Sequence, residues 1–108
     1  MKTLLRQIPA LLFAGVILLP TLGMAHSAIC SCFDNGDNTI TCEGGFSDGS
    51  SASGVRVFVR DMGDQTLDRG KMNEDSEFTF KKPDQAYKIV FDAGPGHQVE
   101  INGKDIIE

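Results

Sequence analysis

Two histidines and three cysteines are the residues of this chain best suited to binding a transition metal. The histidines are His26 and His97, and the cysteines are Cys30, Cys32 and Cys42. Imidazole nitrogen binds copper, nickel and zinc, whereas thiolate sulfur favours Cu(I) and zinc. Four of the five residues fall between positions 26 and 42, so any site near the start of the domain would draw on them.

The first 25 residues predict a secretory signal peptide. A basic start is followed by an apolar run over residues 8–22 and by small residues up to Ala25. Prolines interrupt this run, and it is shorter than the roughly 20 apolar residues of a membrane-spanning helix. We expect cleavage after Ala25, because the alternative after Ala28 would put His26 where a small residue is preferred. The mature protein would then be periplasmic or secreted, without stable membrane insertion.

Cleavage after Ala25 would make His26 an N-terminal metal ligand. The α-amine and Nδ1 of one histidine can chelate an ion, and a second imidazole completes a three-nitrogen site for Cu(II) or Ni(II). His97 is the only other histidine, and a Gly-Pro-Gly turn precedes it. Asp92 could add an oxygen ligand or accept a hydrogen bond from an imidazole N–H. The alternative is that His26 is an unstructured first residue and His97 an ordinary surface residue.

The three cysteines predict one disulfide in an oxidising compartment. Cys30 and Cys32 are two residues apart, so they point to the same face of a strand, and Cys42 lies on the expected partner strand. An odd-length loop places Cys32 opposite Cys42, whereas a slip of two residues brings in Cys30. Both pairings, Cys32–Cys42 and Cys30–Cys42, leave one thiol over. The competing interpretation is a thiolate site for Cu(I) or Zn(II).

Composition predicts a small acidic domain without catalytic machinery. Residues 26–108 number 83 and carry 8 Lys and Arg against 15 Asp and Glu, a net charge of −7. Such a charge disfavours nucleic acid and anionic membranes and favours cations. No serine sits in a nucleophile elbow, and no glycine-rich stretch opens a phosphate-binding helix. The Asp-rich loop over residues 34–39 lacks the spacing of an EF-hand. We therefore expect a protein that is not an enzyme.

Short β-type runs separated by Gly, Asn, Asp and Ser predict the fold. Their number and spacing indicate a single all-β domain over residues 26–108, an antiparallel sandwich of about seven strands. The strands are expected over residues 28–33, 39–43, 55–60, 66–72, 77–80, 87–91 and 97–101. The expected core comprises Ile29, Phe33, Ile40, Phe46, Val55, Val57, Val59, Leu67, Phe78, Phe80, Ile89, Phe91 and Val99.

Three stretches give the chain a family resemblance. They are Ser53 to Val57, Asn73 to Phe80 and Tyr87 to Phe91. Their layout resembles the G-V-x-V, D-x-x-G-x-F-x-F and Y-x-V-x-V pattern of transthyretin-like, carboxypeptidase-regulatory-like β-sandwiches, over residues 53–91. This resemblance, with an immunoglobulin-like arrangement of strands, implies a non-catalytic module.

A second resemblance rests on the Ala25-His26 junction and on the segment Asp92 to His97. An exported β-sandwich with these features is similar to periplasmic copper-resistance proteins and to accessory proteins of nickel and cobalt uptake. The resemblance implies that the protein binds Cu or Ni/Co and delivers it to a membrane transporter, or senses it for one. The competing expectation is a metal-free structural or protein-interaction module stapled by one disulfide.

Overall fold

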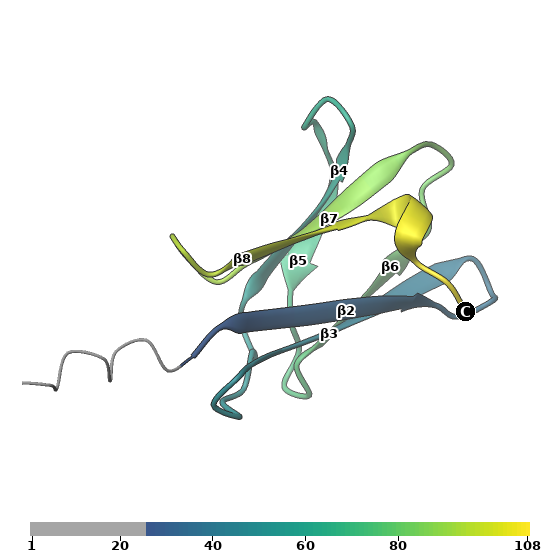
Figure 1. The fold of residues 1–108 in the computed structure, drawn as a ribbon. Coiled ribbons are helices and arrows are strands. Elements are labelled where there is room, and N and C mark those ends of the chain that lie inside the picture. The colour runs from purple at the N-terminus through teal and green to yellow at the C-terminus, as the bar shows by residue number, and fades with distance from the viewer. Residues whose placement is uncertain (1–25) are drawn as a thin grey trace, which may run out of the picture.

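The computed structural model describes residues 26–108, and the predicted signal peptide lies outside them. Seven strands form two antiparallel sheets, which confirms the predicted all-β fold (Figure 1). Among the described residues, no helix is long and apolar enough to cross a membrane. The first sheet has the order β2 (Ala28–Asp34), β3 (Thr39–Phe46), β6 (Glu77–Lys81). The second has the order β5 (Thr66–Lys71), β4 (Arg56–Asp61), β7 (Tyr87–Asp92), β8 (Gln98–Asn102), and β8 leads into a 3-10 turn, η3 (Gly103–Asp105).

The β2–β3 hairpin is formed by the Asp- and Asn-rich loop at its tip. Asp34 Oδ1 accepts a hydrogen bond from the Gly36 amide, and Asp37 Oδ1 accepts one from the Thr39 amide. Asn38 adopts a positive φ of 73°, a conformation that asparagine tolerates better than most residues. These local bonds fix the turn, and the register that follows pairs Cys32 with Cys42.

The core lies between the two sheets, where alternate residues of each strand point inward. The first sheet contributes Ile40, Cys42 and Phe80 to one buried cluster. The second sheet adds four side chains that are completely buried: Val57, Val59, Ile89 and Phe91.

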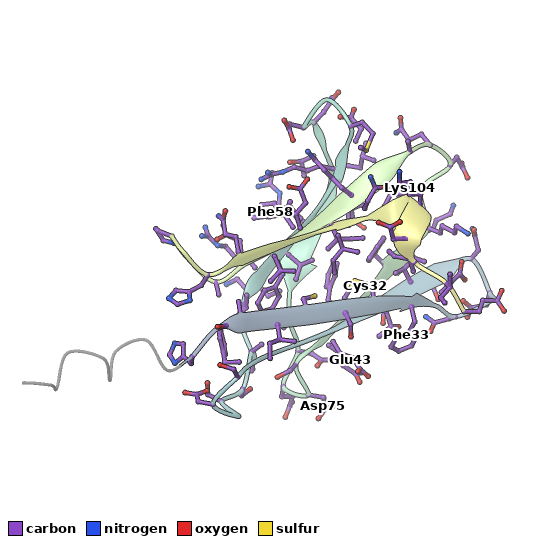
Figure 2. The ribbon with its side chains drawn as sticks, in the orientation of Figure 1. Cys32, Phe33, Glu43, Phe58, Asp75 and Lys104 are labelled. Atoms are coloured by element: carbon purple, nitrogen blue, oxygen red, sulfur yellow. A yellow bond between two sulfur atoms is a disulfide. The ribbon has the colours of Figure 1, made fainter. Side chains whose placement is uncertain are left out.

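Three residues predicted for the core are instead exposed. Ile29, Phe33 and Leu67 have 52%, 37% and 38% of their surface accessible. On β2 the inner face carries Ala28, Cys30 and Cys32, because the disulfide partner Cys42 points into the core. Ile29 and Phe33 must then face outward, and Figure 2 shows Cys32 and Phe33 on opposite sides of β2. Leu67 lies on the edge strand β5, most of which is exposed. The buried residues that the prediction omitted are Cys42, Ala52, Met72 and Tyr87.

Gly44 is a position where the core has no room for a side chain. A Cβ there would lie 2.5 Å from Phe91 Cε2 and 3.2 Å from the Met72 methyl carbon. Both neighbours are buried, so Gly44→Ala should lower the free energy of unfolding by about 1–3 kcal/mol, as measured by urea denaturation followed by circular dichroism. The next residue, Gly45, is the control, because its Cβ would meet nothing closer than the Ser50 carbonyl oxygen at 4.0 Å. Equal losses in the two variants would contradict this account.

Candidate functional site

Three segments meet at one end of the sandwich and bring both histidines together. They are the residues before β2, the loop after β3 and the turn between β7 and β8, which lie at the same end of the molecule (Figure 1). The ring centroids of His26 and His97 are 5.5 Å apart. The His26 ring also lies 5.6 Å from the ring of Phe46, which is in turn 6.3 Å from that of Phe91. A chain of rings therefore connects the core to the histidine pair.

His26 has a carboxylate partner that the sequence analysis did not identify. Its Nδ1 lies 3.1 Å from Asp48 Oδ2, and both side chains are a little under half exposed. Asp48 Oδ1 accepts hydrogen bonds from the hydroxyl and the amide of Ser50. The Ser50 hydroxyl, the Ser50 amide and His26 all favour the charged carboxylate and lower the pKa of Asp48. The sequence signal was the aspartate of the polar segment Asp48-Gly49-Ser50, but aspartate in such a segment is usually only a turn former.

The turn that carries His97 is held by its own backbone. The His97 amide donates to the Gly94 carbonyl, and the His97 carbonyl accepts from the Ala93 amide, at 2.9 and 3.0 Å. Gly94 and Gly96 have φ values of 111° and 79°, which glycine adopts most easily. His97 Nδ1 is buried and has no hydrogen-bond partner among residues 26–108. A buried nitrogen without a hydrogen-bond partner lowers the stability of the folded protein. Coordination of a metal ion by this nitrogen would remove that penalty.

Asp92 holds this turn in place. Its Oδ1 accepts hydrogen bonds from the Gly94 amide and the Gln98 side-chain amide, both at 3.0 Å. Its Oδ2 lies 3.2 Å from the guanidinium of Arg56. Both oxygens therefore already have partners, and the structure gives Asp92 a positioning role. The role of Asp92 as an oxygen ligand stays a prediction and would require one of these bonds to be exchanged.

The same bonds make Asp92 a source of acid sensitivity. The hydrogen bonds from Gln98 and Gly94 and the charge of Arg56 lower the pKa of Asp92 below its usual 3.8. A carboxyl group whose pKa is lower in the folded than in the unfolded state stabilises the folded protein at pH values above its unfolded-state pKa. This contribution is lost as the pH falls through the folded-state pKa. Asp92→Asn should therefore be less stable than the natural chain near neutral pH, and the difference should narrow below about pH 4.

Urea unfolding at a series of pH values would measure this difference. Asp84→Asn is the control, because Asp84 is exposed and has no ion pair within the described part of the chain. A stability difference for Asp92→Asn that stays constant down to about pH 3 would contradict the role assigned to its bonds.

The spacing of the two imidazoles suits a shared ion. A metal about 2.0–2.1 Å from one nitrogen of each ring lies about 3.2 Å from each centroid, so the centroids would be about 4.5–6.4 Å apart. The observed 5.5 Å falls in that range. An α-amine chelate would use the His26 Nδ1 that now faces Asp48. Metal binding would therefore replace the Asp48 contact or recruit Asp48 as an oxygen ligand.

The cysteines form one disulfide, as predicted, and the structure selects between the two pairings. Cys32 and Cys42 are bonded, with an S–S distance of 1.99 Å and a sequence separation of 10. They occupy directly opposed positions of β2 and β3, whereas Cys30 lies opposite Gly44. Cys30 is the free thiol. Within the described part of the chain, only these three cysteines bring three ligand atoms within 4.8 Å of one another. The pair of histidines with Asp48 is a looser arrangement.

Cys30 should be a slow nucleophile in the folded protein. Burial raises its pKa from 9.0 to about 11, because the charged thiolate is poorly solvated there. The thiolate is the reactive form, so its fraction at neutral pH falls about 100-fold. We expect iodoacetamide to modify Cys30 at least about 100-fold more slowly in the native protein than in urea. Mass spectrometry of the alkylated peptide measures both rates, and similar rates would show that Cys30 is not protected.

Comparisons with protein-family models, curated proteins and solved structures find no match to this chain. Two groups of side chains carry metal-binding atoms: the histidine pair with Asp48 at the sandwich end and, once the disulfide is reduced, the three cysteines of β2 and β3.

Proposed function

We propose that this protein is an exported, non-enzymatic β-sandwich that binds a divalent transition metal, Cu or Ni/Co, through His26 and His97. It would deliver the ion to a membrane transporter or sense it for one. The observation that carries the proposal is the 5.5 Å approach of the two imidazole rings. They come from opposite ends of the described chain, and they are its only histidines.

Four features support a metal in this place. His97 stands on a turn fixed by its own backbone bonds, and its Nδ1 lacks a partner among residues 26–108. Asp48 is oriented by Ser50 and presents an oxygen to His26. If the chain is cut after Ala25, His26 gains an α-amine that chelates together with Nδ1. The net charge of −7 over residues 26–108 draws cations toward the domain.

A second candidate function is a metal-free interaction module. His26 already has partners in this structure, since it contacts Asp48 and packs beside Phe46. The Cys32–Cys42 disulfide stabilises the domain without any ion. In this alternative the histidine pair simply fixes the start of the chain against the sandwich end.

Calorimetric titration of the processed protein separates the two candidates. The N-terminus is first confirmed by mass spectrometry, and Cu(II), Ni(II) and Co(II) are then added. The proposal expects one equivalent of at least one ion to bind. Mutating a residue that only hydrogen-bonds to a metal ligand lowers metal affinity by roughly 10- to 100-fold. Removing the ligand itself in His97→Ala should therefore lower the affinity by at least about 100-fold. Binding of none of the three ions, or unchanged affinity in His97→Ala, would support the metal-free module.

A processed chain whose α-amine is acetylated provides a matched control. It keeps both imidazoles and loses the α-amine ligand at His26. Weaker binding by this chain than by the processed protein would assign the α-amine as a ligand. Equal binding would leave a site made of the two imidazoles and a carboxylate.

A further inference from the structure

The three cysteines form a second cluster, separate from the histidine pair. Cys30 and Cys32 both lie on the inner face of β2. Cys42 lies beside Cys32 on the same face of the neighbouring strand β3. Cys42 is completely buried, and the other two are partly buried. The three sulfur atoms all lie within 4.8 Å of one another. The disulfide uses two of them and leaves the Cys30 thiol beside it.

We propose that reduction of the Cys32–Cys42 disulfide converts this cluster into a three-sulfur site for Cu(I). With metal–sulfur bonds of about 2.3 Å, three sulfurs in a plane around one ion are about 4.0 Å apart. The Cys30 sulfur already lies within 4.8 Å of each of the other two sulfurs, within reach of a shared ion. The Cys32 and Cys42 sulfurs, now bonded to each other, would have to move apart once the bond is broken.

The chemistry requires a reductant, and a dithiol is the class that fits. The dithiol supplies two electrons and two protons to the S–S bond and becomes a disulfide itself. Cys32 and Cys42 become thiols. Cu(I) then forms bonds to the three sulfurs and displaces the thiol protons to solvent, so its affinity rises with pH.

Cu(I) suits this cluster better than the divalent ions proposed for the histidines. Soft thiolate sulfur selects Cu(I), whereas imidazole nitrogen and carboxylate oxygen suit divalent ions. Structural zinc requires four ligands, and the described residues bring only three such atoms together here. The inference does not rest on the proposed function, because neither histidine takes part.

The test uses the processed protein reduced with a phosphine and freed of reductant under anaerobic conditions. Cu(I) is presented as its complex with a chromophoric chelator, whose loss of colour reports transfer to the protein. The natural chain and the variant His26→Ala/His97→Ala should each take up one equivalent. Cys30→Ser keeps the Cys32–Cys42 pair and removes the third sulfur, so its affinity should fall at least about 100-fold. Equal affinity in Cys30→Ser would overturn the proposal.

Two further measurements test whether the copper is bound by the folded protein and not by an unfolded chain. Circular dichroism should show β-structure in the reduced, Cu(I)-loaded protein, whether reduction alone preserves it or Cu(I) restores it. X-ray absorption at the copper edge should show three sulfur neighbours. A loaded protein without β-structure, or copper bound by two sulfurs or by nitrogen, would refute the proposed site.

Discussion

Phe91→Ala is expected to lower the free energy of unfolding by about 3–5 kcal/mol, since deleting a fully buried aromatic ring costs both its transfer energy and a cavity. Phe91 has no exposed surface and is the largest of the completely buried side chains. It lies on β7, and its ring approaches both Gly44 and Phe46 of the opposite sheet. The two sheets would therefore lose a central contact. Urea denaturation followed by circular dichroism measures the change.

Phe33→Ala is the matched control for this substitution. Phe33 belongs to the same residue type but lies on the outer face of β2 with 37% of its surface exposed. Its loss should cost clearly less, about 1–2 kcal/mol, because more than a third of its surface is already in contact with solvent and its removal leaves no closed cavity. A cost as large as that of Phe91→Ala would mean that the outer face of β2 is covered by another surface in solution.

Removal of the disulfide in Cys32→Ala/Cys42→Ala should cost about 2–4 kcal/mol. The sequence separation is 10, and a bond closing so short a loop stabilises a domain by roughly 3 kcal/mol, mainly by restricting the unfolded chain. A domain of this size has a small core, so the loss would be a large fraction of its stability. Urea denaturation of the natural chain with and without a phosphine reductant gives a second estimate.

Cys30→Ala is the control for the disulfide variant. It removes the third sulfur and leaves the Cys32–Cys42 bond in place. Cys30 is partly exposed, so its truncation should cost less than about 1.5 kcal/mol. If Cys30→Ala destabilised the protein as much as the double variant, the pairing in solution would differ from Cys32–Cys42.

Most of the fold could be predicted from the sequence because its signals are local. Alternation in stretches such as Val57 to Val59 and Ile89 to Phe91 placed their strands within one or two residues of the observed bounds. Turn-forming residues such as Gly36 and Asn38 marked the hairpin between β2 and β3. The inner face of β2 was predicted wrongly, because Ile29 and Phe33 are more apolar than the cysteines with which they alternate. A disulfide to a buried partner outweighed that preference.

The candidate site was only partly predictable. The sequence singled out His26, His97 and Asp92 by residue type, yet it could not place them relative to one another. Asp48 was not predicted as a site residue, because aspartate in a Gly- and Ser-rich loop is usually only a turn former. Its contact with His26 spans 22 residues of sequence, and no local pattern encodes such a distance.

By itself the sequence determined an all-β chain, its strands and turns, its acidic charge and the small set of residues able to bind a metal. Each follows from residue type and short-range spacing. Only the tertiary structure decided which cysteines pair, which oxygen faces His26, and that the rings of His26 and His97 approach to 5.5 Å. Those outcomes depend on strand register and on how two sheets pack, which are set by the whole chain at once.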